Sequence, residues 1–145
     1  MPTGTRNDPF AAFNFIVQID EVTVAGFSEV SGLGFETDAI DYREGAEAPR
    51  MRKLSGLHKY TNIVFSRGFT NSHELWDWRK KVIDGKTDRK AGSIVLRNEA
   101  GEEALRWNFD QAWPCKWEGP TFKASANEVA IEKMEICVER VELVV

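Results

Sequence analysis

The chain has 145 residues, of which 42% are hydrophobic and 29% are charged, a composition typical of a folded domain rather than of a disordered segment. Its 19 basic and 23 acidic residues give a formal net charge of −4, so the sequence offers no whole-chain basic field that would hold nucleic acid. The two cysteines, Cys115 and Cys137, lack metal-ligand spacing, which argues against a zinc site and against a disulfide scaffold.

The start of the chain predicts an extended arm over residues 1–9, because it is rich in Thr, Gly, Asn, Asp and Pro. We expect a single domain over residues 10–145. The sequence shows neither the apolar stretch of a signal peptide nor a run of about 18 apolar residues, so we expect synthesis in the cytoplasm and no membrane insertion by this chain.

Three strands are predicted in the first third of the domain. Phe13–Asp20 alternates apolar and polar residues, which is the period of a strand with one apolar face, and Val22 and Val24 continue it. Gly26–Gly34 predicts a strand broken by a bulge or sharp bend at its glycines. A further strand is expected over Phe35–Tyr42.

A long charged loop is predicted next, because residues 43–60 mix charges with Gly, Pro and Ser and show no sustained period. Asn62–Thr70 then predicts a strand. Asn71 resembles an N-cap with Glu74 three residues later. The helix that follows, over residues 73–83, places an apolar arc on one side, with Gly85 as its C-cap; the expected anchors in this arc are Leu75, Trp78 and Val82.

The second half of the chain predicts a hairpin and a long final strand. Ser93–Arg97 and Ala104–Asp110 flank a four-residue loop with Gly101 at a left-handed position, and the second strand is expected to break at Trp113 and Pro114. Residues 128–145 are β-rich but change phase, which predicts a bulge or a strand whose ends pack in different surroundings.

These elements predict a mainly β fold, a β-sandwich or barrel of about seven strands with one flanking helix and one long charged loop. Hydrolase, NTPase and dinucleotide-binding motifs are absent from the sequence. His58 and His73 have no companion ligands, and Cys115 beside Pro114 is read as a packing residue. We therefore expect no catalytic, metal or cofactor site, and not an enzyme.

Several stretches, taken in order and spacing, resemble the tail tube proteins of contractile phage tails and of related contractile injection systems. The resemblance covers Asp8 to about Val138. It rests on DPFAAFNFIVQID, GFSEVSGLGFETDAIDYREG, RKLSGLHKYTNIVFSRGFT, ELWDW, LRWNFDQAWPCKWEGP and ASANEVAIEKMEI.

The resemblance implies a structural subunit of a hollow inner tube. Six copies would form a ring around a continuous inner β-barrel, and rings would stack into a tube that sheath contraction drives through a target envelope, conducting protein effector or DNA. The implied partners are other copies of the chain, sheath protein, baseplate, hub and spike proteins, a tape-measure protein, a tube cap or terminator, and luminal cargo. The implied location is a phage tail or tail-like particle, with release outside the cell in some systems.

The resemblance also implies roles for two sets of residues. The loop over residues 44–58 resembles the attachment loop of the family, so its candidates for contacts with neighbouring subunits are Arg50, Arg52, Lys53, Leu54 and Leu57. The hairpin resembles the segment that lines the channel. If Arg97 joins the polar side of the second strand, the candidates for the channel wall are Arg97, Arg106, Asn108 and Asp110.

Two other functions remain open. One is a related ring-former, either a tube initiator at the baseplate or a secreted ring protein of the type VI kind. The other belongs to a different class, a monomeric tryptophan-rich β-sandwich that binds a sugar or a lipid. The second alternative predicts a concave apolar pocket and a monomer in solution.

Overall fold

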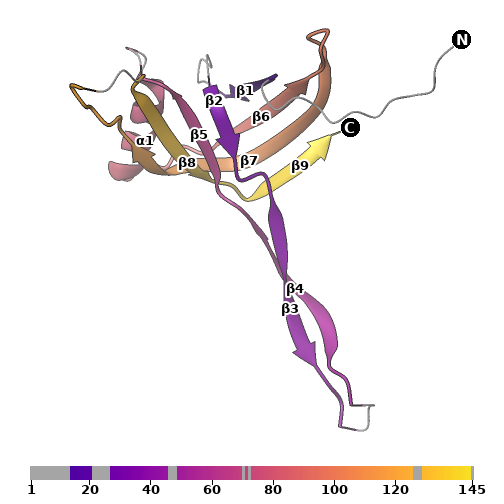
Figure 1. Ribbon diagram of the computed structural model, residues 1–145. Coiled ribbons are helices and arrows are strands. Elements are labelled where there is room, and N and C mark those ends of the chain that lie inside the picture. The colour runs from indigo at the N-terminus through magenta and orange to yellow at the C-terminus, as the bar shows by residue number, and fades with distance from the viewer. Residues whose placement is uncertain are drawn as a thin grey trace, which may run out of the picture.

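The computed structural model describes residues 14–20, 27–45, 49–69, 71, 73–125 and 129–144. The predicted arm and the continuation at Val22 and Val24 lie outside these residues. The described part of the chain contains nine strands and one helix (Figure 1). In order they are β1 (Phe15–Ile19), β2 (Phe27–Ser31), β3 (Phe35–Tyr42), β4 (Arg52–Tyr60), β5 (Ile63–Gly68), α1 (Glu74–Ile83), β6 (Lys90–Arg97), β7 (Glu103–Glu118), β8 (Ile131–Cys137) and β9 (Arg140–Val144).

Seven strands form two layers that share one long strand. The hydrogen-bonded order is β1-β6-β7-β8-β5-β2, and β9 also pairs with β7. The sixteen residues of β7 divide between the layers, since the first half pairs with β6 and β9 and the second half pairs with β8. Between the halves, Gln111 has a φ of 52°, which bends the strand. The first layer is therefore β1-β6-β7-β9, and the second is β7-β8-β5-β2.

The predicted break of the strand at Trp113 and Pro114 is wrong, because β7 continues to Glu118. Pro114 pairs with Ile136 of β8, and the register shifts between Pro114 and Lys116. In this half of β7 the structure shows a strand partner on one side only, and proline is tolerated in an edge strand because its missing N–H can face away from the ladder.

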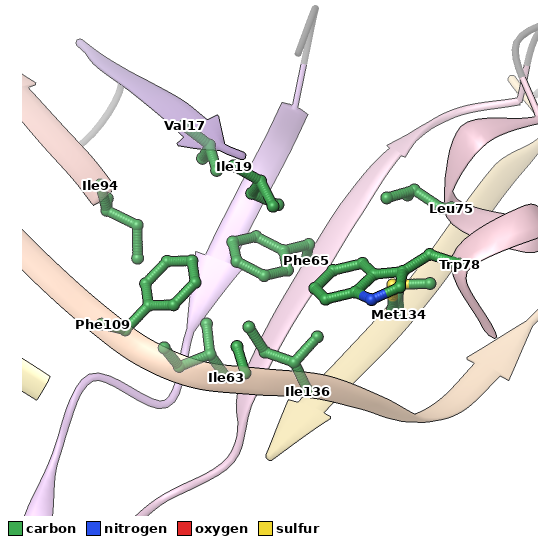
Figure 2. Close-up of a cluster of buried hydrophobic side chains, with 11 residues drawn as sticks. Val17, Ile19, Ile63, Phe65, Leu75, Trp78, Ile94, Phe109, Met134 and Ile136 are labelled. Carbon is green, nitrogen blue, oxygen red and sulfur yellow. The ribbon is translucent and has the colours of Figure 1, made fainter. Parts of the chain in front are cut away.

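The core lies between the two layers (Figure 2). Alternate residues of each strand point inward, as the period of two requires. Fully burying a side chain of this size contributes about 1.5–3 kcal/mol. The first layer contributes Val17, Ile19, Ile94 and Phe109, the second contributes Ile63, Phe65, Met134 and Ile136, and the helix contributes Leu75 and Trp78.

A buried ion pair sits at the second layer, where β5 and β8 run together. Arg67 and Glu132 are 4% and 1% exposed, and the Arg67 Nε donates a hydrogen bond to Glu132 Oε1. Trp117 Nε1 donates to the other carboxylate oxygen at 3.1 Å. The guanidinium also lies 3.8 Å from the Glu74 carboxylate and 5.8 Å from the centroid of the Phe27 ring. This cluster joins β2, β5, β7, β8 and α1.

The helix begins at Glu74, and the predicted capping by Asn71 is wrong. The N-cap position is His73, which makes no capping hydrogen bond through its side chain. Glu74 is paired with the buried Arg67 instead of reaching back along the chain. At the other end Gly85 has a φ of +81° and its N–H donates to the Val82 carbonyl, so the predicted glycine signal for the helix end is confirmed.

Residues 43–60 do not form the predicted long loop. Residues 52–60 are the strand β4, which pairs antiparallel with β3 to form a two-stranded hairpin outside the sandwich. The hairpin projects far from the body (Figure 1). The predicted bend before it is confirmed at Gly32, where φ is +89° and a Cβ atom would lie 2.0 Å from the Asn62 carbonyl oxygen, so only glycine fits.

The predicted mainly β sandwich with one helix is confirmed, with a different strand count. The described strands do not close into a barrel within one chain. Nine strands replace the predicted seven, because β4 was assigned to a loop and the C-terminal segment divides into β8 and β9. None of the described helices is long and apolar enough to span a membrane.

Candidate functional site

The face of the first layer that points away from the core carries the polar side chains of β7, and we call it the polar face, although Ile16, Val95 and Val144 lie on it as well. Arg106 and Asn108 of β7 lie opposite Val95 and Ser93 of β6, and residues directly opposite in a ladder share a face. Their neighbours Trp107 and Phe109 point to the core side. The predicted division of this strand into an apolar and a polar side is therefore what the structure shows.

Hydrogen bonds and ion pairs tie the polar face together. Arg106 bonds Glu103 at 2.6 Å and Gln18 of β1 at 3.3 Å. The Ser93 hydroxyl donates to Asn108 Oδ1 at 2.6 Å. Charges of both signs are thus held in fixed pairs on the surface, which limits the field that any one of them projects.

Two of the predicted channel residues lie near the borders of this face. Asp110 lies opposite Arg140 of β9. Arg97 ends β6, two residues beyond Val95 and therefore on the same side of the strand, after a shift in register between Leu96 and Arg97. The structure thus places Arg97, Arg106, Asn108 and Asp110 on one face of one sheet.

Strand β9 adds polar residues that the sequence interpretation missed. Glu142 lies opposite Asn108, and Arg140 bonds the Glu142 carboxylate at 3.0 Å. The signal was available, since Arg140 and Glu142 alternate with Val141 and Leu143, but the break between β8 and β9 was not recognised. A hollow of about 300 Å³ opens on this face, lined in part by Asp20, Ser93, Asp110 and Glu142.

Within the described part of the chain, β1 pairs with β6 alone, so its other edge presents backbone groups to a further strand. Asp20 N–H donates to the Ala91 carbonyl and Arg97 N–H donates to the Asn14 carbonyl, at 3.0 and 2.8 Å. Backbone groups alternate between the two sides of an antiparallel strand, so the even-numbered residues between 14 and 20 bond β6. The N–H groups of the odd-numbered residues Phe15, Val17 and Ile19 therefore face away from β6.

The opposite edge of the same layer is β9. Both edge strands are five residues long, and among the described residues each has one strand partner, β6 for β1 and β7 for β9. Following the antiparallel pairings across the layer, β1 and β9 run in opposite directions. Unpaired edges of matched length are templates for pairing with another chain.

The β3–β4 hairpin is a second candidate surface. Ile40 lies opposite Leu54, and these side chains are 50% and 46% exposed. Leu57, at 73%, is still more exposed. Ion pairs between Lys59 and Asp38, at 3.3 Å, and between Lys53 and Asp41 link the two strands.

The predicted subunit-contact residues all fall on this hairpin. Arg50 lies in the connection between the strands, and Arg52, Lys53, Leu54 and Leu57 lie on β4. All five are exposed. The sequence therefore predicted an exposed segment but gave it the wrong local structure; Ile40 and Tyr42 on the other strand are exposed as well.

The two cysteines show no sign of a reactive site. Cys115 lies in the irregular part of β7 and is half-buried, with its thiol 3.5 Å from the Glu135 carbonyl oxygen. Burial, reinforced by the neighbouring Cys137 thiol, raises the pKa of Cys115 to about 12. A thiol with this pKa stays protonated at neutral pH and is a poor nucleophile. Among the described residues no group of three or more His, Cys, Asp or Glu side chains could hold a metal ion.

Residues 11–142 match the family model described as T4-like virus tail tube protein gp19. The chain belongs to this tail tube family. It is therefore a structural subunit of the tail tube of a contractile tail or injection system, as the resemblance in its sequence implied. Among curated proteins, no relative matches the sequence.

Solved structures of contractile injection systems contain chains with the same fold. A chain of the PVC sheath–tube complex in its extended state is 32% identical, with a TM-score of 0.85 over 95% of this tail tube chain and 93% of that chain. A chain of the PVC sheath/tube terminator in its extended state is 30% identical, with a TM-score of 0.88 over 97% and 100%. A chain of the anti-feeding prophage tube-terminating cap is 28% identical, with a TM-score of 0.87 over 99% and 95%.

Proposed function

We propose that this chain is the main tube subunit, and that β9 of one copy pairs with β1 of the next to close a hexameric ring. The observation that carries this proposal is the pair of unpaired edge strands, equal in length and opposite in direction, at the two sides of one sheet. Repeating the four-strand layer through such edges joins the layers of all copies into one continuous barrel.

The polar face would then line the channel. The core covers the other face of the layer, so the barrel has one face free to point inward. Paired charges and amides, such as Arg106 with Glu103 and Ser93 with Asn108, would keep such a wall hydrated. The cargo would be a protein effector or DNA, and the chain itself would have no enzymatic activity and bind no cofactor.

The hairpin would contact neighbouring subunits through Arg50, Arg52, Lys53, Leu54 and Leu57. Its exposed apolar side chains support this role, because an extended two-stranded hairpin with no core of its own is stabilised by packing on another surface. Sheath, baseplate, hub and spike proteins, a tape-measure protein and a cap or terminator would be the other partners. The assembled particle would be a phage tail or a tail-like particle, in some systems released from the cell in which the chain was made.

Edge pairing can be tested with one matched pair of variants, Phe15→Pro and Phe15→Ala. Both substitutions remove the phenyl side chain of Phe15. Only proline also removes the backbone N–H group that faces the free edge of β1. We expect the alanine variant to form rings in negative-stain electron microscopy and the proline variant to remain monomeric by light scattering. Rings of undiminished yield from the proline variant would exclude pairing at this edge.

A tube terminator is the second candidate, because two relatives of similar identity come from a terminator and a terminating cap. The number of rings that stack separates the two roles. A main tube subunit forms tubes of many rings, whereas a terminator stops after one ring and blocks further growth. Electron microscopy of the purified chain over a range of concentrations, with its baseplate components added as a template, distinguishes them.

A further inference from the structure

The two cysteines of the chain lie on adjacent strands. Cys115 belongs to β7, and Cys137 is the last residue of β8. Both are half-buried free thiols. Cys115 is a poor nucleophile by itself, but two neighbouring thiols can also be joined to each other through exchange with a disulfide. Since the sequence has no third cysteine, an intramolecular disulfide can form in one way only.

Both sulfur atoms lie on the face of the second layer that points away from the core. Met134 and Ile136 point into the core. Glu135 and Cys137 alternate with them along β8 and therefore point the other way. The Cys115 thiol lies 3.5 Å from the Glu135 carbonyl oxygen and 3.8 Å from its carboxylate, which places this thiol on the same outer face.

The bulge in β7 moves Cys115 toward Cys137. Trp113 lies opposite Cys137. In a regular ladder Cys115 would lie two positions further along, opposite Glu135, and diagonal neighbours of this kind are about 7–8 Å apart. A disulfide joins residues whose Cα atoms are about 4.4–6.8 Å apart. The register shift places Lys116 opposite Glu135 instead, so Cys115 is the extra residue and lies closer to the level of Cys137.

We propose that Cys115 and Cys137 form an intramolecular disulfide when the folded chain meets a low-molecular-weight disulfide such as oxidised glutathione. The bond ties the second half of β7 to the end of β8, just before the chain passes into β9. A reducing cytoplasm disfavours this bond, and an oxidising medium outside the cell favours it. The inference concerns the folded chain alone and does not depend on the proposed tube function.

The reaction has two exchange steps. The Cys137 thiolate attacks one sulfur of oxidised glutathione, which forms a mixed disulfide and expels one glutathione thiolate that takes up a proton. Cys115 then loses its proton to solvent and attacks the Cys137 sulfur, which expels the second glutathione. Two protein thiols are oxidised, and one glutathione disulfide is reduced to two glutathione thiols.

The second step is slow near neutral pH. Burial, reinforced by the Cys137 thiol, raises the pKa of Cys115 to about 12, so its thiolate fraction rises about tenfold with each pH unit below that value. The other groups beside this sulfur are the Glu135 carboxylate, the Lys116 ammonium and the Asn62 amide. Closure is still favoured over reaction with a second glutathione disulfide, because two thiols held together by the fold react at a high effective concentration.

The test treats the wild-type chain, Cys115→Ser and Cys137→Ser with oxidised glutathione and follows mass and free thiols. The wild-type chain should lose the mass of two hydrogen atoms and both free thiols. Cys115→Ser lacks the closing thiol and should keep one glutathione on Cys137, whereas Cys137→Ser should react much more slowly. Conversion of the wild-type mixed disulfide to the closed form should become about tenfold faster for each pH unit above neutrality.

Stability provides a second readout. Oxidation should raise the denaturation midpoint of the wild-type chain, because a crosslink that fits the native fold restricts the unfolded chain. The matched control is Cys115→Ser under the same treatment, whose midpoint should stay near that of its reduced form. Circular dichroism before oxidation checks that both serine variants are folded, and the wild-type result decides the inference even where a variant is not.

Three results would overturn the inference. They are a wild-type chain that keeps bound glutathione without closing, disulfides that form between chains instead of within one chain, and a closed form with a lower denaturation midpoint than the reduced chain. Electron microscopy of the reduced chain tests the proposed function separately. Rings without disulfide closure would overturn only the disulfide, and closure in a chain that never forms rings would overturn only the tube function.

Discussion

At the scale of single residues, the buried pair of Arg67 and Glu132 ties the second layer to the helix. Both charges are removed from water, and each has more than one polar neighbour. Pairs of this kind contribute little net stability relative to well-packed apolar residues, but removing one partner leaves a buried charge without compensation. Removing one partner should therefore lower the free energy of unfolding more than replacing both partners by apolar residues.

Replacing Arg67 by methionine should lower the free energy of unfolding by about 3–5 kcal/mol, since Glu132 then remains buried with Trp117 as its donor. The double variant Arg67→Met with Glu132→Met should be less destabilised than the single variant. Lys53→Met, which removes an exposed pair with Asp41, should change stability by less than about 1 kcal/mol. Denaturant unfolding of the three variants checks this order. A double variant with a lower free energy of unfolding than Arg67→Met would contradict it.

A second ionic group makes stability depend on pH. Hydrogen bonds from Lys90, at 3.1 Å, and from Lys81, at 3.2 Å, hold the pKa of the Asp88 carboxyl below its usual value of 3.8. A lowered pKa in the folded state stabilises the fold at pH values above the unfolded pKa, and this contribution is lost as the pH falls below about 4.

Asp88→Asn should therefore be less stable than the wild-type chain at neutral pH and should lose less stability between pH 5 and about pH 3. The substitution keeps the backbone carbonyl that accepts a hydrogen bond from Trp78 Nε1. Thermal unfolding at several pH values measures the difference. If both proteins lost the same stability between pH 5 and about pH 3, a group other than Asp88 would be responsible for the loss.

At the scale of elements, the hairpin is separable from the sandwich. None of its residues belongs to the buried core, and its two ends already meet at the base, where Thr61 N–H donates to the Gly34 carbonyl at 3.0 Å. Folding of the body therefore does not depend on it, whereas assembly should.

A chain in which a short Gly-Ser linker replaces residues 35–60 should fold with a denaturation midpoint close to that of the wild-type chain, because every core contact is kept. Tubes should be absent at all concentrations. Denaturation and light scattering on the same sample measure both properties. A truncated chain that fails to fold would show that the hairpin contributes to the core in a way that its exposure does not indicate.

Sequence patterns predicted the elements whose residues alternate toward a core. The period of two in β1 follows from burial on one side, so it is visible in the chain itself, and the apolar residues of β5 mark a strand that is buried along most of its length. Strand β4 has no buried side, since seven of its nine residues are exposed and the other two, Gly56 and Tyr60, are half-buried, so its sequence shows no alternation toward a core. The predicted cap at Asn71 was wrong because Glu74 forms an ion pair with Arg67 instead of bonding the start of the helix. Arg67 lies on β5, and only the fold brings it near Glu74.

At the scale of the whole molecule, the family and its structural role could be predicted from the order of its motifs, and the surfaces could be predicted only in part. That Arg106 and Asn108 share a face could be predicted because they alternate with apolar residues within one strand. The proximity of the exposed residues Phe69 and Ile131 could not be predicted, because they are distant in the sequence and only the pairing of β5 with β8 brings them to one end of the sheet. Surfaces of this kind are set by topology and not by any local pattern.

The double membership of β7 has a mechanical consequence. Two sheets held together only by side-chain packing could slip past each other under a mechanical load. Here one continuous backbone of sixteen residues passes from the layer with the polar face into the layer beneath the helix. For one layer to slide past the other, the backbone of β7 would have to stretch, or the hydrogen bonds of β7 on both sides of Gln111 would have to break. The shared strand therefore resists sliding between the two layers of each subunit.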